Sequence, residues 1–413
     1  MTAVAAAERA AEHPQPTPRG NDDARVISLV AIAHFTSHIM QMALPPLLPV
    51  LHRYFGASYT ELGLLVTCYF VTSGFGQALA GILVDRYGAP RLLVGGMVVA
   101  STGIALAGMA PSLLTMMPLA LLAGLGNSVF HPADLSIISH RVSERLLGRA
   151  YASHAVAGQI GFAASPVLVA AVASFASWRV ALVGLGIVGL AISAVVYASR
   201  AHIAYARTAN EPGRARRGGY FRVIGSPIII MAFAYFILTA FAGSGVQAFS
   251  VSALTVGYGI DLAGATLALT LFLTASAVGI VAGGFLADRT DNHQRVAITG
   301  VLLAALMMAA VAILRVRPDM LAALMAVGGL CYGITAPSRD VLVRRAAGSV
   351  GMGSVFGFVY SGFDLGSSTA PLLFGALLDR HAAHGVFLGV AIAFALAAPA
   401  VLQVRTRPAA AGG

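Results

Sequence analysis

The sequence predicts an all-α membrane protein with twelve transmembrane helices in two pseudo-symmetric six-helix bundles. Three observations support this fold class. The 413 residues are 58% hydrophobic and only 10% charged, whereas a soluble domain carries about 25% charged residues. Twelve apolar runs are long enough to cross a bilayer, which takes about 20 residues. One short motif also recurs at the same point of each half of the chain. In lipid, such a chain satisfies its backbone hydrogen bonds most simply as helices.

The apolar runs define the expected elements and domains in chain order. They cover residues 27–50, 61–82, 92–110, 113–138, 149–173, 179–199, 227–250, 263–286, 296–314, 319–338, 352–377 and 385–404. The first stretch mixes alanine, proline and charged residues without an apolar core, which is typical of disorder and not of a signal peptide. We therefore expect a disordered cytoplasmic tail at 1–25, a bundle at 26–199, a cytoplasmic linker at 200–226, a bundle at 227–404 and a cytoplasmic tail at 405–413.

The positive charge of the chain indicates its orientation in the membrane. All 26 basic residues are arginine, and the net charge is +10. With both termini inside, 21 arginines fall on the cytoplasmic side and 5 on the other, as the positive-inside rule requires. This favours a bacterial inner-membrane protein with both termini cytoplasmic. The charge orients helices, so we expect no nucleic-acid partner. Cys68 and Cys331 lie inside expected spans, where we expect small buried side chains and no disulfide.

A repeated motif relates the two halves. GILVDRYGAPR at 81–91 separates two apolar runs, and GFLADRTDNHQR at 284–295 repeats its Gly-x-Leu-x-Asp-Arg core 203 positions later. Such internal symmetry is typical of transporters with two rocking halves. GNSVFHPAD (126–134) and GITAPSRD (333–340) form a second pair, predicted to be proline-containing turns.

The first copy resembles the signature loop of the major facilitator superfamily, between its second and third helices. The resemblance implies that family's fold, a midplane cavity and alternating access. We expect Asp85 to cap the start of the eleventh helix near Gly353 across the two halves, because an anion is stabilised at a helix N-terminus. Asp288 would do the same near Gly148. The expected conformational latch is Gly81, Asp85, Arg86, Gly88, Arg91, Gly284, Asp288 and Arg289.

Titratable residues inside the spans are candidates for the transport site, since a charge at the bilayer centre costs about 2.5–3.5 kcal/mol. The third, sixth, ninth and twelfth spans have none in their interiors and are predicted to be lipid-facing scaffold. His34, His38 and Gln41 share one helix face, and prolines that follow at 45, 46 and 49 would break that helix. This face would bind substrate or carry protons; the alternative is hydrogen bonding between helices.

The fourth and fifth spans add His131, Asp134, His154 and Gln159. The Phe-His-Pro sequence at 130–132 is similar to that of the fosmidomycin-resistance branch of the superfamily, a branch of drug exporters, most clearly over 27–175. For Asp134, the alternative to a functional role is a salt bridge to Arg141.

The eleventh span places Tyr360 and Asp364 on one face, and the tenth ends in Arg339. Asp364 lies near mid-membrane, where burial favours uptake of a proton, as proton coupling requires. The alternatives are a charge pair with Arg339 or a hydrogen bond to Tyr360.

These observations predict a secondary transporter for a small organic compound, most simply a monomeric drug or metabolite exporter coupled to protons. The fourth span lacks the arginine, and the fifth lacks the Gly-Pro repeat, that are typical of many drug/proton antiporters. Import of an organic acid or sugar, export of a metal chelate, and a membrane sensor therefore stay open. No nucleotide-binding loop, metal-hydrolase spacing or nucleophile motif occurs. We therefore expect no enzyme activity, no cofactor and no metal site; the partners would be substrate, protons and lipid.

Overall fold

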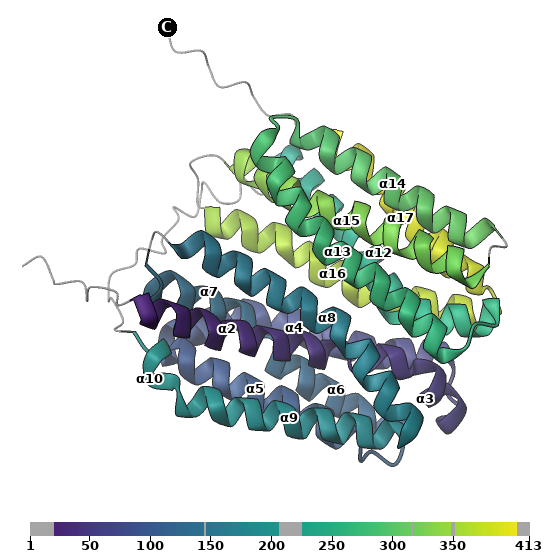
Figure 1. Cartoon of the computed structure of the whole chain (residues 1–413), viewed down its shortest axis with the longest axis horizontal. Coiled ribbons are helices and arrows are strands. Elements are labelled where there is room, and N and C mark those ends of the chain that lie inside the picture. Colours follow the sequence, from purple (N-terminus) through teal and green to yellow (C-terminus); the bar gives the residue numbers. More distant parts are fainter. Residues whose placement is uncertain (1–19, 144–145, 206–224, 315–316, 348–351, 403–413) are drawn as a thin grey trace, which may run out of the picture.

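The computed structural model describes residues 20–143, 146–205, 225–314, 317–347 and 352–402, and every regular element among them is a helix. The N-terminal half contains α2 (Gly20–Gln41), the 3-10 turn η1 (Pro45–Leu47), α3 (Leu48–Phe55), α4 (Tyr59–Tyr87), α5 (Ala89–Ala107), α6 (Leu113–Asn127), α7 (Phe130–Arg141), α8 (Leu147–Phe175), α9 (Trp178–Ala198) and α10 (Arg200–Ile203). The C-terminal half contains α12 (Pro227–Tyr258), α13 (Leu262–Arg289), α14 (His293–Ile313), α15 (Pro318–Ala347), α16 (Met352–Asp379) and α17 (Ala383–Leu402). These halves form two groups side by side (Figure 1).

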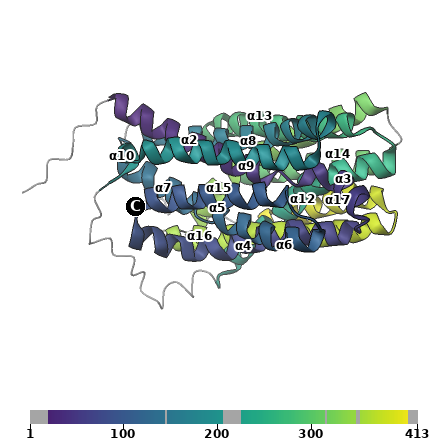
Figure 2. The ribbon, with the colours of Figure 1, turned by 90° about the horizontal axis from the view of Figure 1, so that it is seen from below.

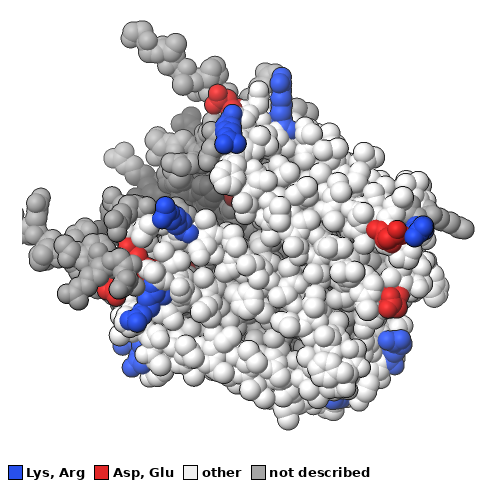
Figure 3. All heavy atoms as spheres, viewed as in Figure 1, with Lys and Arg blue, Asp and Glu red and all other residues white. Residues whose placement is uncertain are grey.

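The helices form a multi-pass membrane protein. Ten candidate spans within the described residues are long and apolar enough to cross a bilayer. The 29 residues of α4 and the 28 residues of α16 complete twelve crossings. Both groups run along one common axis (Figure 2), and charged residues on the face shown in Figure 3 gather near the helix ends, with an uncharged band between them. The predicted twelve-helix fold is confirmed.

The first crossing bends where its prolines fall. The α-helix ends at Gln41, and the chain continues through the 3-10 turn into α3, because proline supplies no amide hydrogen to a helix. Carbonyls in the last turn of a helix need other donors. Ser165 on α8 supplies one, since its hydroxyl donates to the Ile39 carbonyl at 2.8 Å. The bend is thereby fixed against α8.

Two helices extend into stretches that were expected as tail and linker. The helix α2 begins at Gly20, inside the stretch expected as a tail, because buried Asp23 anchors it. The Asp23 carboxylate accepts hydrogen bonds from the amide and hydroxyl of Ser143 at 3.2 and 2.7 Å. Apolar patterning cannot detect such a polar anchor. The short helix α10 lies in the expected linker, of which residues 206–224 fall outside the described residues.

The predicted pair of proline-containing turns is found only in the N-terminal half. There, α6 ends at Asn127 and α7 begins at Phe130, two residues before Pro132. The prediction is wrong for the second copy, because α15 continues through Pro337. Close packing explains the difference: a Cβ added to Gly333, four residues before Pro337, would lie 2.1 Å from a backbone oxygen of α13. Contact with α13 holds this helix together despite the missing hydrogen bond.

The two halves meet mainly along α4 and α16, and also along α8 and α13. Glycine permits this close approach, since a Cβ on Gly63 would lie 2.3 Å from the carbonyl oxygen of Pro371. The Thr67 hydroxyl donates to the carbonyl of Ser368 at 2.8 Å. These contacts join the start of α4 to the end of α16, and we call this the closed end of the molecule.

Toward its other end, α4 diverges from α16. Gly74 still lies against Asp364, where an added Cβ would be 2.8 Å from the aspartate Cβ. The next residue, Phe75, is 78% exposed, and Leu79 is 62% exposed. We call the end at which α4 finishes, at Tyr87, the open end. The candidate site lies where the halves separate.

Candidate functional site

A cavity of about 360 Å³ lies between the two halves. Helices α2, α4, α6, α7 and α8 form one wall, and α12, α13, α15 and α16 form the other. Nearly all residues predicted for the substrate and proton pathway line it: His34, His38, Gln41, His131, His154, Gln159, Arg339, Tyr360 and Asp364. Asp134 is fully buried and contacts the histidines instead of the cavity. None of the described lining residues comes from α5, α9, α14 or α17, which were expected to be scaffold.

Asp134 orients two histidines from different helices. Its Oδ2 atom lies 3.1 Å from His34 Nδ1 on α2 and 3.2 Å from His154 Nε2 on α8. The two imidazole rings stack with centroids 3.5 Å apart. When Asp134 is ionised it is only an acceptor, so each of the two nitrogens can donate to it in the tautomer that carries its hydrogen there. The salt bridge considered with Arg141 is not formed, because the Arg141 Nε donates to the carbonyl of His202.

Three polar groups of this cluster have unused hydrogen-bonding capacity. Asp134 Oδ1 and His38 Nδ1 are buried without a partner. The His131 ring, with its centroid 5.1 Å from that of His34, opens onto the cavity. No hydrogen bond joins His131 to another residue in the described part of the chain. The cluster can therefore accept protons or ligands.

Glycines on α8 leave room for the histidine side chains of α2. A Cβ on Gly158 would lie 2.9 Å from the His34 ring and 2.8 Å from that of His38. A Cβ on Gly161 would lie 2.6 Å from the carbonyl oxygen of Phe35. Glycine thus lets the two backbones approach, which places both imidazoles between the helices.

The opposite wall carries an ion pair from α15. Arg339 Nε donates to Asp340 Oδ1 at 2.9 Å, and the Tyr360 hydroxyl donates to the same oxygen at 3.2 Å. The guanidinium also lies 4.5 Å from the centre of the Phe236 ring. Arg339 is thus held between a neighbouring acid and an aromatic face, and it does not pair with Asp364.

Asp364 stands apart from this ion pair. It lines the cavity from α16, with its Cβ against Gly74 of α4. No hydrogen bond or ion pair joins its carboxylate to another described residue, and its backbone carbonyl accepts from the Ser368 hydroxyl. Neither alternative considered for Asp364, the pair with Arg339 or the bond to Tyr360, is therefore formed.

The sequence analysis missed several uncharged polar residues of the cavity: Gln77, Asn127, Gln247 and Tyr332. Three of these four are amides, which carry no titratable group. The Asn127 amide donates to the Ser73 hydroxyl at 2.9 Å. An amide side chain within an apolar run could have indicated these residues, because an amide without a hydrogen-bond partner is costly in an apolar environment, as a charged group is.

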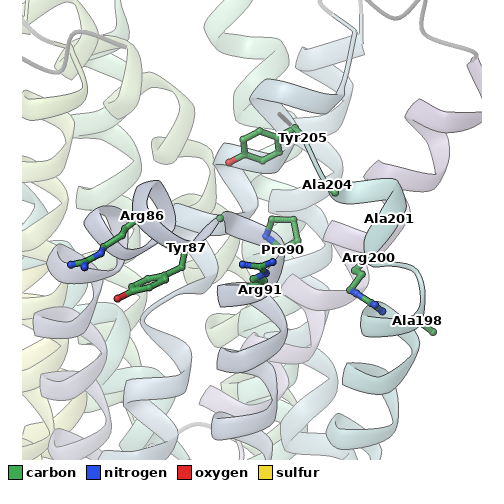
Figure 4. A pocket seen from close by; sticks show the side chains of 10 residues that line it. Arg86, Tyr87, Pro90, Arg91, Ala198, Arg200, Ala201, Ala204 and Tyr205 are labelled. Carbon is green, nitrogen blue, oxygen red and sulfur yellow. The ribbon is translucent and has the colours of Figure 1, made fainter. Parts of the chain in front are cut away.

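The side chains of the two acids on which the expected latch depends lie outside the described part of the chain. The side chains of Asp85 and Asp288, and residues 348–351 before α16, are not described. Gly81 and Gly284 have open space at the Cβ position, Gly88 has a positive φ of 89°, and Arg289 ends α13. Arg86 and Arg91 line a separate pocket of about 660 Å³ at the open end, outside the central cavity (Figure 4). The latch stays a prediction.

Comparison with known proteins gives the family. The sequence profile of the Major Facilitator Superfamily matches residues 30–250 and 231–412. The chain is 25% identical over 283 residues to the uncharacterized MFS-type transporter YfnC of Bacillus subtilis, covering 67% of this chain and 68% of that protein. It is 24% identical over 293 residues to the fosmidomycin resistance protein of Escherichia coli, covering 67% and 70%.

A solved structure shares the fold. A bacterial homologue of the human lysosomal transporter Spinster, crystallised in an inward-facing and unoccupied conformation, superposes with a TM-score of 0.76. The match covers 95% of this chain and 100% of that chain, at 14% sequence identity. The resemblance to the superfamily and to the fosmidomycin-resistance branch, predicted from the motifs, is confirmed.

Proposed function

The chain belongs to the Major Facilitator Superfamily, and we propose that it exports a small organic compound across the bacterial inner membrane in exchange for protons. Family membership supports secondary transport as its activity. The main support for proton-coupled export is the cavity between the halves, which has titratable side chains on both walls. Transport by alternating access needs a site that both halves share.

Two groups on opposite walls suit proton coupling. Asp364 has no partner among the described residues and lines the cavity, so it can exchange a proton with water there. On the other wall, His34 and His154 share one carboxylate oxygen, and an imidazole can bind and release a proton. In the proposed cycle, substrate binding and proton binding compete in one cavity, so each favours release of the other.

The similarity to a fosmidomycin resistance protein favours export as the direction and suggests fosmidomycin as the first probe. We further propose that both termini are cytoplasmic and that the monomer is the working unit. The open end of the cavity would then face the cytoplasm, where an exporter loads its substrate.

The test is fosmidomycin transport in proteoliposomes with an imposed pH gradient. We expect fosmidomycin to move against the proton flow, and Asp364→Asn to abolish gradient-driven movement while leaving counterflow intact. Asp319→Asn is the matched control, because Asp319 pairs with Arg317 in exposed surroundings away from the cavity. Gradient-driven transport that survives in Asp364→Asn would remove this residue from the coupling mechanism.

The same assay separates the rival functions. Movement along the proton flow would replace export by import of an organic acid or sugar, tested with those compounds. Binding without counterflow would favour a sensor. His34→Ala and His38→Ala should weaken fosmidomycin binding or change its pH dependence. Unchanged binding in both variants would favour a hydrogen-bonding role between helices.

A further inference from the structure

A histidine cluster in the N-terminal wall of the cavity has the composition of a metal site. His34, His131 and His154 each offer one ring nitrogen, and these three nitrogens all lie within 4.8 Å of one another. The residues come from α2, α7 and α8, so their sequence spacing follows no metal-binding motif and none was predicted. We propose that these three histidines, together with Asp134, bind one divalent transition-metal ion of the cobalt, nickel or zinc class.

The atomic separations suit a tetrahedral ion. A zinc–nitrogen bond of about 2.0–2.1 Å gives neighbouring ligand atoms about 3.3 Å apart. Asp134 Oδ2 lies 3.1 Å from His34 Nδ1 and 3.2 Å from His154 Nε2. These two separations already suit such an ion when the hydrogen of each imidazole sits on its other ring nitrogen, so that the nitrogen facing Asp134 offers a lone pair. The fourth ligand position belongs to His131, whose ring nitrogen lies within 4.8 Å of those of His34 and His154.

The unpaired oxygen of Asp134 is a second, independent observation. This carboxylate is 0% exposed, and its Oδ1 atom has no hydrogen-bond partner among the described residues. A buried carboxylate with one unsatisfied oxygen is costly. A cation held by the three imidazoles would lie beside the Asp134 carboxylate. It would compensate the negative charge of the ionised carboxylate more fully than hydrogen bonds from two neutral histidines can.

The donor set also indicates which ions the site would accept. Imidazole nitrogens suit zinc, nickel, copper and iron, whereas magnesium and calcium prefer shells of oxygen ligands. The His131 ring lines the cavity, so an ion in the cavity can reach the site. The inference concerns binding alone, and it holds or fails independently of the direction of transport and of the organic substrate.

The test is a Co²⁺ titration of the purified full-length protein, produced with an affinity tag that contains no histidine. The titration is run at pH 8, because metal-binding imidazoles must be unprotonated, and is followed by the visible absorption of bound Co²⁺. We expect saturation at one Co²⁺ per chain, displacement by Zn²⁺, and no displacement by a large excess of Mg²⁺. Absence of saturable Co²⁺ binding would overturn the proposal.

Three variants locate the site. His131→Ala should weaken Co²⁺ binding at least about tenfold, a loss that even the removal of a supporting partner of a metal ligand typically causes. The His131→Ala variant should still fold, since His131 forms no hydrogen bond to a described residue. If the melting temperature of His131→Ala falls, His131→Gln is used in its place. Asp134→Asn should lose affinity similarly. The matched control is His384→Gln. In the parent protein His384 contacts the Tyr258 hydroxyl at the closed end, away from the cluster. Equal affinity in His131→Ala and His384→Gln would refute the assignment.

Discussion

Asp379 joins the two halves at the closed end, and its removal is a direct test of how that end is held. Its carboxylate, at the end of α16, accepts hydrogen bonds from the backbone amides of Tyr59 at 2.6 Å and Thr60 at 2.8 Å, and from the Thr60 hydroxyl at 2.5 Å. Those two residues begin α4, so an acid of one half caps a helix of the other. Asp379→Asn removes the charge and leaves a single accepting oxygen.

The expected magnitude follows from the bonds that are lost. A hydrogen bond to a charged group contributes about 1.5–3 kcal/mol, and an anion at a helix start about 0.3–1 kcal/mol. Because Asp379 is only half-buried, solvent screens both contributions, and we expect a net loss of about 1–2 kcal/mol. Such a change alters a two-state ratio by about 5–30-fold. Asp379→Asn should therefore populate conformers that are open at this end.

The pKa of Asp379 defines when this contact persists. Partial burial raises the pKa, but the hydrogen bonds from Thr60 and Tyr59, with nearby His52, outweigh it and lower the pKa below its ordinary value of 3.8. A lowered pKa means that the contact stabilises closure at higher pH and is lost as pH falls through the lowered value. Closure of this end should therefore not depend on the charge of Asp379 between pH 5 and 8.

The assay is a distance measurement between spin labels across the closed end. Cysteines replace exposed Met109 in the N-terminal half and Ile313 in the C-terminal half, in a background without Cys68 and Cys331. A longer-distance population should grow in Asp379→Asn. The matched control is the Asp319→Asn variant introduced above, which removes an acid at the same end without crossing the halves. Identical distance distributions in the two variants would refute the capping role.

Three further predictions follow from the packing and the charge distribution. Gly158→Ala should lower the melting temperature, with an overpacking cost of about 1–3 kcal/mol, whereas Gly184→Ala, which meets nothing within 4 Å, should not; equal melting curves would contradict the packing argument. Asp85→Asn should raise cytoplasmic labelling of cavity cysteines on α2 and α7 if Asp85 is a latch, and an unchanged labelling rate would end that idea. A reporter that works only in the periplasm, fused after Arg407, should stay silent, and activity would reverse the proposed topology.

The sequence determined the architecture of this protein to within a few residues. Twelve apolar runs became twelve crossings because lipid leaves the backbone no alternative to helix. The split between charged and uncharged spans also predicted that α2, α7, α8 and α16 line the cavity and that α5, α9, α14 and α17 do not, since a titratable group at membrane depth must face the interior of the bundle. The break at Gln41 followed from local proline chemistry alone. Each of these inferences needs only the neighbours of a residue along the chain.

The partners of the charged residues were decided only by tertiary structure. Asp134 is 100 positions from His34 and 20 from His154, and only the packing of α2, α7 and α8 brings them to one point. From the sequence, a salt bridge of Asp134 with Arg141 and a charge pair of Asp364 with Arg339 were possible alternatives, and neither forms. Hydrogen bonds act over about 3 Å, and no residue pattern fixes distances between helices to that precision. The geometry of the histidine cluster is therefore a property of the fold.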